Sequence, residues 1–450
     1  MSVLVRFAPS PTGRLHVGNV RAALFNWLFA HKEGGKFLLR SDDTDLERST
    51  KAFEDAIQED LAWLGLTHDE FARQSERFSV YDAVSEGLKE RGLLYPCYET
   101  AEELDRKRKL QRARGLPPVY DRAALNLTET EMKRLEDEGR TPHWRFKLAQ
   151  APVAWDDMIR GQVTLDTATI SDPVLIREDG QYLYTLPSCI DDVDFEVTHI
   201  IRGEDHVTNT AAQIEVFRAI HEVRGGGEMP VFGHHSLLVG KDGEGLSKRL
   251  GSLAIGQMRE DGIEPQAITS LLARLGTSDP VEPVIDMEVL AQGFDVDRIG
   301  RAPARFDMDE LRAVNAKVLH LMPYEREQER LEGMGVSEAL WTVVRGNLET
   351  LADAAGWKDV TEGQITPDIA EEDREFCAAA AEHVPAGDLT AEDWSAFVGA
   401  VKGATGRKGK GLFMPLRKAL TGRSSGPEMA DLFPLIGSEK AKARLSGEAA

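Results

Sequence analysis

The first 66 residues alternate between strand and helix patterns, which is typical of a parallel α/β sheet. Residues 3–8 (VLVRFA) form an apolar run that a Pro-Gly turn ends, and apolar residues then recur at helical spacing as far as Gly34. Residues 36–40 (KFLLR) predict a second strand. Residues 52–66 predict a second helix, which Ser49 or Thr50 can cap. The chain therefore begins as a doubly wound sheet.

This alternation stops and later resumes. A Lys/Arg-rich helical run and a Pro pair break it from about residue 78 to 151. Residues 141–148 and 162–186 then read as several strands joined by turns. Strand and helix patterns return over residues 195–223, and a strand over residues 232–240 closes the series. We therefore expect a Rossmann-like α/β domain that is split by an α+β insertion.

The second half of the chain has a different pattern. After about residue 252 the apolar spacing is helical, as in residues 266–276 and 339–356, and no strong strand remains. We expect this half to be all-α. The predicted boundaries are 1–77 and 185–245 for the Rossmann-like domain, 78–184 for the insertion, and 246–315 and 316–450 for two helical domains.

Composition places the chain among ordinary globular proteins. Of 450 residues, 42% are apolar and 29% charged, as in soluble domains. Three distant cysteines make a disulfide framework improbable, so we expect a reducing cytoplasm. No signal peptide pattern and no run of about 20 apolar residues is present, so no membrane partner is expected.

A net charge of −22 argues against nucleic acid as a partner, but the charge is unevenly distributed. Residues 401–427 contain no acid and seven cations. These cations are Lys402, Arg407, Lys408, Lys410, Arg417, Lys418 and Arg423. Such a basic segment fits either a polyanion contact or a solubilising loop, and composition alone leaves both open.

A His-x-Gly motif opens the first predicted helix, within residues 10–19 (SPTGRLHVGN). The N–H groups and the positive dipole end of a helix N-terminus suit a phosphate. Gly18 would let a nucleotide lie against the backbone, and His16 could donate to a phosphate oxygen. The same motif also fits a helix-capping His beside a packing Gly. The segment is neither a GxGxxG fingerprint nor a Walker A loop.

Two further polar clusters follow predicted strands. Residues 39–45 (LRSDDTD) contain three acids that could bind a cation or an ammonium group or cap a helix, but Arg48 stands where an EF-hand needs Gly. Residues 184–206 contain Tyr184 and Arg202. Arg202 could bind a carboxylate bidentately or pair with a neighbouring acid.

The segment 239–249 (VGKDGEGLSKR) is a glycine-rich loop that ends in two adjacent cations. Taken alone it fits a solvated turn. After the closing strand of a split sheet, it fits a phosphate-facing loop instead, in which Lys248 would neutralise charge that builds up in a phosphoryl or nucleotidyl transition state.

The order of these motifs resembles the class I aminoacyl-tRNA synthetases, and within them the bacterial glutamyl-tRNA synthetases. HVGN stands where the class has its HIGH signature, and GLSKR stands where it has KMSKS. PSPTGxLHVG, LRxxDTD, IRGEDH and LFMPLRKALTG are together specific to that family, and the resemblance covers essentially the whole chain.

The resemblance implies a Rossmann-like catalytic domain, an acceptor-stem-binding insertion, a stem-contact helical domain and a helical anticodon-binding domain. It assigns catalysis to His16 and Lys248. The glutamate-binding residues that the resemblance implies are Arg6, Ala8, Ser10, Asp42, Tyr184, Ser188 and Arg202. Its ATP-binding residues are His16, Gly18, Asp205, Leu237, Leu238, Lys241 and Lys248. Its tRNA contacts fall on the basic segment, at Arg407, Lys408, Lys410 and Arg417.

The implied reaction joins L-glutamate to tRNA in two steps. ATP with Mg²⁺ first gives glutamyl-adenylate and pyrophosphate, and the terminal adenosine of tRNA then attacks the adenylate. Positioning and charge stabilisation should suffice for both steps. The resemblance also implies a monomer and a need for bound tRNA before glutamate is activated. It leaves open whether glutamine tRNA is charged too.

Four departures from the family pattern matter. Gly245 stands where the signature loop usually begins with Lys, and we hypothesise that Lys241 replaces that cation. Cys97 retains only part of the zinc motif that some relatives carry, so no zinc is expected. Asp42 is one methylene shorter than the usual Glu, and Ser188 stands where relatives often have Asn.

Other readings remain. A tRNA-binding paralogue with an inactive catalytic site would share most of these motifs, and Gly245 is consistent with it. A truncated relative that glutamylates a modified tRNA base would lack the helical half. A glutaminyl enzyme would carry β-barrel anticodon domains, whereas residues 315–450 read as helices.

Overall fold

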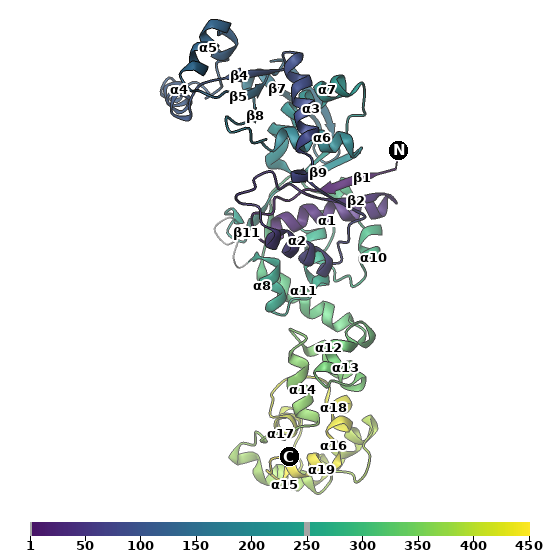
Figure 1. The fold of residues 1–450 in the computed structure, drawn as a ribbon. Coiled ribbons are helices and arrows are strands. Elements are labelled where there is room, and N and C mark those ends of the chain that lie inside the picture. The colour runs from purple at the N-terminus through teal and green to yellow at the C-terminus, as the bar shows by residue number, and fades with distance from the viewer. Residues whose placement is uncertain (1, 247–252) are drawn as a thin grey trace. The chain divides into compact units, whose positions relative to one another are not determined.

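The computed structural model describes residues 2–246 and 253–450 (Figure 1). A seven-stranded sheet has the order β3-β2-β1-β9-β10-β6-β7. Its strands are β1 (Leu4–Phe7), β2 (Lys36–Ser41), β3 (Glu70–Arg73), β6 (Pro152–Asp157), β7 (Gly161–Asp166), β9 (His199–Gly203) and β10 (Val231–His235). Six of them pair in parallel, and only β7 is antiparallel to its neighbour.

Helices lie on both sides of this sheet, as Figure 1 shows. They are α1 (Val17–Lys32), α2 (Lys51–Trp63), α3 (Phe78–Glu90), α6 (Thr185–Asp194) and α7 (Val207–Arg224). Helix α1 packs on β1, β2 and β9. A core cluster joins the strand residues Leu38, Ile200 and Phe232 to α3, α6 and α7. The split Rossmann-like fold that the sequence predicts is confirmed.

A helix cap and a glycine turn fix the start of α2 and the end of α1 at the positions that the sequence predicts. Thr50 accepts the backbone N–H of Phe53 at 3.2 Å and so caps α2. Helix α1 ends at Lys32, and Gly34 then takes a positive φ of 62° that an L side chain would strain. This turn delivers the chain directly into β2.

The insertion contains a second sheet and two exposed helices. The sheet is formed by β4 (Leu94–Cys97), β5 (His143–Phe146) and β8 (Val174–Ile176), and the helices are α4 (Ala101–Ala113) and α5 (Glu129–Asp137). Strands β6 and β7 fall within the predicted insertion but extend the main sheet, where β6 pairs with β10. The sequence pattern predicts strands in this region but does not show which strands they pair with. Asp157 of β6 and Phe232 of β10 are 75 residues apart, and such a distant pairing leaves no local signal.

The remainder of the chain is mostly helical. A pair of short parallel strands, β11 (Leu238–Gly240) and β12 (Ala304–Phe306), is the exception, and β12 falls where we expected no strong strand. The remaining helices up to residue 321 are α8 (Ile255–Glu260), α9 (Pro265–Arg274), α10 (Met287–Gln292) and α11 (Met308–Leu321).

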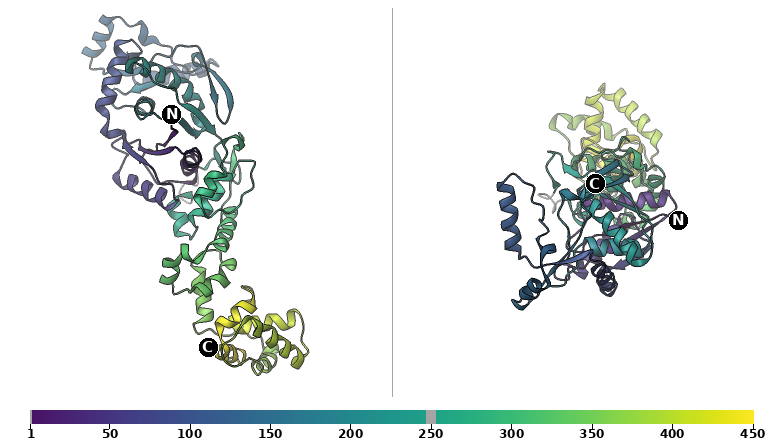
Figure 2. Two further views of the ribbon diagram at one scale, coloured as in Figure 1. Left: turned by 90° about the vertical axis from the view of Figure 1, so that its right-hand side faces the viewer. Right: turned by 90° about the horizontal axis from the view of Figure 1, so that it is seen from above.

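The chain divides into two compact units. Unit 1 is 1–259, 269–281 and 286–307, and unit 2 is 260–268, 282–285 and 308–450. The described residues of unit 2 contain no strand, and Figure 2 draws them as helices coloured green to yellow. After residue 321 these are α12 (Gln328–Gly333), α13 (Glu338–Val344), α14 (Asp353–Thr361), α15 (Arg374–Ala381), α16 (Ala391–Thr405), α17 (Lys410–Thr421), α18 (Met429–Ile436) and α19 (Ser438–Leu445).

The sequence predicts neither a disulfide framework nor a membrane-spanning segment. The three cysteines are buried and form no disulfide. Within residues 2–246 and 253–450, helices long and apolar enough to cross a bilayer are absent.

Candidate active site

A cavity of about 710 Å³ lies at the carboxyl ends of β1 and β9, the edge at which open α/β sheets bind ligands. Ten of the residues that the sequence assigns to glutamate or ATP line it. They are Arg6, Ala8, Ser10, His16, Gly18, Tyr184, Arg202, Asp205, Leu237 and Leu238. Segments nearly 200 residues apart in sequence therefore meet at one site within unit 1.

His16 both caps helix α1 and lines the cavity. Its Nδ1 accepts the backbone N–H of Gly18 at 3.0 Å, while Asn19 accepts the backbone N–H of His16 at 2.7 Å. Burial lowers the pKa of His16, so the ring is neutral near pH 7. With Nδ1 used as an acceptor, the proton sits on Nε2, which is then a donor. The capping role and a phosphate-binding role are therefore compatible.

Arg202 is held at the cavity wall by uncharged groups. Its Nη1 donates to the Tyr184 hydroxyl at 3.1 Å, and its Nη2 donates to Thr210 at 2.7 Å and Gln213 at 2.6 Å. Its Nε lies 3.3 Å from Nε2 of His234. In the described part of the chain no carboxylate pairs with Arg202, because Glu204 pairs with Arg160 instead. The guanidinium charge remains available for a bound anion.

A buried ion cluster lies behind the glutamate side of the cavity. Arg6 pairs with Asp192 at 3.1 Å, and the fully buried Arg40 pairs with both Asp192 at 2.8 Å and Asp42 at 2.7 Å. Arg40 also donates to Ser188 Oγ at 3.0 Å. Asp42 and Ser188 are buried, and neither is among the described residues that line the cavity.

The sequence did not reveal four polar residues of the cavity, namely Arg21, Asn26, His206 and His235. Asn26 shares one face of α1 with Gly18, since eight residues are close to two helical turns. That spacing was a usable signal. Arg21 is fully buried and donates to the carbonyls of Ser236 and Leu275, at 2.5 Å and 2.8 Å.

The balance of charge in the cavity favours anions. Burial lowers the pKa of His206 to about 4 and that of His235 to about 3, so both are neutral near pH 7. Burial also lowers the pKa of Arg21, to about 10, which still leaves it charged. The described residues supply an ion-pair partner for neither Arg21 nor Arg202, so two positive charges face the space where a carboxylate and phosphates would lie.

The glycine-rich loop forms a tight turn beside the cavity. Gly243 takes a φ of 82°, its N–H donates to Gly240 O at 2.8 Å, and Val239 bridges Gly245. Gly245 and Leu246 line the cavity. Lys248, the cation to which the sequence assigns the phosphates, lies outside the described residues.

Lys241 does not line the cavity. Its ammonium pairs with Asp307 at 2.7 Å, and its side chain is 66% exposed. To replace the missing signature lysine it would have to exchange Asp307 for a phosphate.

The Lys241 hypothesis predicts that Lys241→Ala lowers kcat of glutamate activation well over tenfold, because one of two phosphate-facing cations would be lost. ATP–pyrophosphate exchange measures the effect. Asp307→Asn is the matched control, since it removes the same ion pair but keeps the ammonium. An effect near unity for Lys241→Ala, or equal losses for both variants, contradicts the hypothesis.

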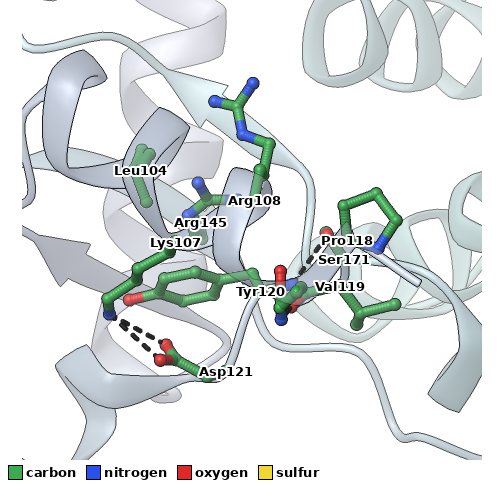
Figure 3. A pocket seen from close by; sticks show the side chains of 10 residues that line it. Leu104, Lys107, Arg108, Pro118, Val119, Tyr120, Asp121, Arg145 and Ser171 are labelled. Carbon is green, nitrogen blue, oxygen red and sulfur yellow. Dashed lines mark hydrogen bonds and ion pairs between the residues drawn. The ribbon is translucent and has the colours of Figure 1, made fainter. Parts of the chain in front are cut away.

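The insertion contains a second, smaller pocket of about 280 Å³ (Figure 3). Tyr120 lies in it, and the guanidinium of Arg145 lies 4.2 Å from the centre of the Tyr120 ring. The Tyr120 hydroxyl donates to Glu99 at 2.8 Å and lies 3.7 Å from the Cys97 sulfur. Burial raises the pKa of Cys97 to about 12, so this thiol is protonated near pH 7.

The expectation that the protein holds no zinc stays a prediction. Among the described residues, no group of three or more His, Cys, Asp or Glu side chains is placed to hold a metal. We expect elemental analysis of the purified protein to find far less than one zinc per chain. We also expect a chelator to change Tm by less than about 1 °C, since a structural zinc would contribute to folding. Stoichiometric zinc whose removal lowers Tm would contradict this.

The four proposed tRNA contacts differ in exposure. Arg407 pairs with Asp373 and stacks on Phe376 at 4.3 Å, and Arg417 donates to Pro427 O at 2.8 Å. Lys408 and Lys410 are exposed. These two lysines, at the start of α17, are therefore the members of the set that present charge to solvent.

Comparison with known proteins gives consistent matches over the whole chain. Residues 2–313 match the family described as tRNA synthetases class I (E and Q), catalytic domain, and residues 318–448 match an anticodon binding domain. The chain is 61% identical to glutamate--tRNA ligase 1 of Maricaulis maris, over 99% of both chains. It is 57% identical to glutamate--tRNA ligase 2 of Hyphomonas neptunium, over 98% of this chain and 99% of that one.

Solved structures agree with these matches. A crystal structure of a glutamate tRNA ligase from Elizabethkingia meningosepticum in complex with its amino acid has a TM-score of 0.83 and 30% identity, covering 99% of this chain and 98% of that chain. The glutamate-tRNA synthetase from Elizabethkingia anophelis has the same TM-score and identity, covering 99% of both chains.

Proposed function

The chain belongs to the class I tRNA synthetases for glutamate and glutamine, and we propose that it ligates L-glutamate to tRNA through a glutamyl-adenylate. The observation that carries this proposal is the buried Arg202 guanidinium, held in the cavity wall without an acid partner among the described residues. A carboxylate ligand would complete its pairing.

Arg202 and Tyr184 supply complementary donors for the side-chain carboxylate of glutamate. The hydrogen bonds of Arg202 occupy four of its five N–H groups, leaving one on Nη1. The Tyr184 hydroxyl accepts from Nη1, so its own O–H remains a donor. We assign the γ-carboxylate of glutamate to this pair. Arg6, Ala8 and Ser10 lie at the carboxyl end of the neighbouring strand β1 and are assigned to the rest of the amino acid.

Asp42 and Ser188 act on glutamate through Arg40 in this proposal. Both contact the Arg40 guanidinium and lie behind the cavity wall. Arg40 and Arg6 share Asp192, so this cluster fixes the position of Arg6. A direct contact between Asp42 and the amino group of glutamate, as the resemblance implies, needs Asp42 to turn away from Arg40.

His16, Gly18 and the start of α1 form the ATP side of the site. His16 Nε2 is a donor for a phosphate oxygen, and the helix dipole favours negative charge there. Leu237, Leu238 and Asp205 line the part assigned to the nucleoside, and Lys248 is assigned to the leaving pyrophosphate.

Mg²⁺ would arrive on the phosphates of ATP. Mg²⁺ usually keeps several waters and binds through substrate phosphates with few protein ligands. The described residues contain no group of three or more candidate ligands, which fits such delivery, so we assign it no protein ligand set.

The proposal also covers partners and location. We propose that Lys408 and Lys410 contact the phosphate backbone of tRNA, since they are exposed cations in an otherwise acidic chain. We further propose that the protein acts as a monomer in the cytoplasm. An inactive tRNA-binding paralogue is the alternative, and it would bind tRNA without activating glutamate.

Aminoacylation with radiolabelled glutamate on separately purified glutamate and glutamine tRNAs tests the proposal. Charging of glutamate tRNA supports it, and the result with glutamine tRNA decides whether the specificity is broad or narrow. Tight binding of tRNA with no charging of either substrate would favour the inactive paralogue.

A further inference from the structure

A buried acid–imidazole pair lies beside Arg202, and neither the sequence motifs nor the family resemblance assigned it a role. Asp157 ends β6, His234 lies on the neighbouring strand β10, and both side chains are fully buried. Asp157 Oδ2 lies 2.5 Å from His234 Nδ1, and His234 Nε2 lies 3.3 Å from Arg202 Nε. The contacts thus run from Asp157 through His234 to Arg202.

The surroundings of Asp157 fix its role as an acceptor. Its Oδ1 accepts the backbone N–H groups of Ile159, Arg160 and His234 at 3.0–3.1 Å. Burial alone would raise the pKa of Asp157, but hydrogen bonds, chiefly from His234, lower it to about 2. A carboxylate at this position can only accept, so Nδ1 of His234 carries the proton.

This tautomer decides what His234 offers to Arg202. With the proton on Nδ1, Nε2 keeps its one lone pair as an acceptor that faces the Arg202 Nε–H. The Thr210 hydroxyl lies 2.8 Å from the same nitrogen and 3.0 Å from the His206 carbonyl oxygen, to which it can donate its single proton instead. Thr210 in turn accepts from Arg202 Nη2. The Arg202 Nε–H therefore meets an acceptor, His234 Nε2, whose orientation and tautomer depend on Asp157.

The arrangement also keeps negative charge away from Arg202. Asp157 is separated from the guanidinium by the width of an imidazole, and the four groups that contact Arg202 are uncharged. An acid in direct contact would compete with a substrate carboxylate. A neutral acceptor instead holds the guanidinium in place and leaves its charge for the ligand.

We propose that Asp157 and His234 form a positioning pair that fixes the Arg202 guanidinium and thereby sets the preference for glutamate over glutamine. The proposal rests on the assignment of Arg202 to the substrate side chain. The γ-carboxylate of glutamate can accept from both the remaining Nη1–H of Arg202 and the Tyr184 hydroxyl. The γ-amide of glutamine has one oxygen and one NH₂ group, so its NH₂ would face one of these donors and that hydrogen bond would be lost. This discrimination between glutamate and glutamine requires the Arg202 guanidinium to be held in a fixed orientation.

Asp157→Asn is the sharpest test because it is nearly isosteric and reverses the tautomer. The Asn oxygen can keep the three backbone contacts, while its amide must donate to Nδ1, which moves the His234 proton to Nε2. Nε2 would then face the Arg202 Nε–H as a second donor. We expect KM for glutamate to rise roughly 10- to 100-fold, with kcat and KM for ATP nearly unchanged, in exchange assays with tRNA present. The preference for glutamate over glutamine should fall as well.

Asp172→Asn is the matched control. Asp172 is also a buried carboxylate of unit 1, but it accepts from Tyr95 and Arg122 at 2.6 Å and contacts neither His234 nor Arg202. The KM of the Asp172→Asn variant for glutamate should stay within about twofold of that of the unmodified protein.

A second variant covers the case in which Asp157→Asn does not fold. Thr210→Val keeps the side-chain volume but removes the hydroxyl that contacts Arg202, and it should also raise KM for glutamate.

A double-mutant cycle with Arg202→Lys separates positioning from general stability. If the pair acts through Arg202, Asp157→Asn should raise KM less than about twofold further in the Arg202→Lys background. An unchanged KM for glutamate together with a lowered Tm would overturn the proposal, as would full additivity in the cycle. Absence of any exchange by the unmodified protein would instead count against the proposed function.

Discussion

We expect Arg202→Gln to lower kcat/KM for glutamate in tRNA-dependent ATP–pyrophosphate exchange by roughly 30- to 5,000-fold. Arg202 is 6% exposed, and the described residues supply no acid for its charge. Truncating one partner of a buried charge pair costs about 2–5 kcal/mol, much of it because the other charge is left unpaired. Here the unpaired group would be the substrate carboxylate. Steady-state kinetics over a wide range of glutamate concentrations measures the effect.

Arg224→Gln is the control for this prediction. It removes a guanidinium from unit 1 that pairs with Asp194 at 3.0 Å on the surface, away from the cavity. We expect its kcat/KM to stay within about twofold, because surface ion pairs contribute little. A loss of less than about threefold for Arg202→Gln would mean that Arg202 does not bind the substrate carboxylate.

We expect Arg40→Met to lower the thermal stability of unit 1 more than removal of a surface ion pair does. Arg40 is fully buried between Asp42 and Asp192, with Asp191 Oδ2 at 3.7 Å. Burial raises the pKa of Asp42 to about 6, and Arg40 opposes that rise by favouring the ionised carboxyl. Removing Arg40 takes away the buried cation that Asp42, Asp191 and Asp192 share. Breaking a buried pair in this way costs about 3–5 kcal/mol, or roughly 6–20 °C in Tm.

Lys36→Met tests whether burial is the cause. Lys36 pairs with Glu70 at 2.8 Å on the exposed edge of the same sheet. Its loss should shift Tm by no more than about 2 °C. Differential scanning calorimetry on both variants measures the difference. Equal shifts would show that the Arg40 cluster contributes no more than a surface pair.

Much of the catalytic site could be predicted because its residues follow strands. Arg6 lies near the end of β1, Ala8 and Ser10 follow that strand, and Arg202 lies near the end of β9. A parallel sheet brings these positions to one edge whatever the insertion does. His16 was predictable for the same reason, since it opens the helix after β1. The order of strands and helices pointed to His16 and Arg202, whereas the family resemblance supplied Arg6, Ala8 and Ser10.

Other features depend on pairings that leave no local trace. Strand β3 has polar residues at both ends and no buried side chain, so its alternation is weak. Asp157 meets His234 only because β6 joins the main sheet beside β10. Asp42 pairs with Arg40, two residues before it, but the need for that partner follows from the burial of both side chains, which the local sequence does not show. Arg21 lies on a helix that is buried almost all round, where helical spacing no longer separates polar from apolar faces.

ATP–pyrophosphate exchange by the unmodified protein, with and without glutamate tRNA, tests the central claim most directly. We expect exchange that requires glutamate and is not supported by glutamine. As the family resemblance implies, we also expect it to rise strongly when tRNA is present. Tight binding of tRNA with no glutamate-dependent exchange under any of these conditions would contradict the claim and leave the chain as a tRNA-binding paralogue.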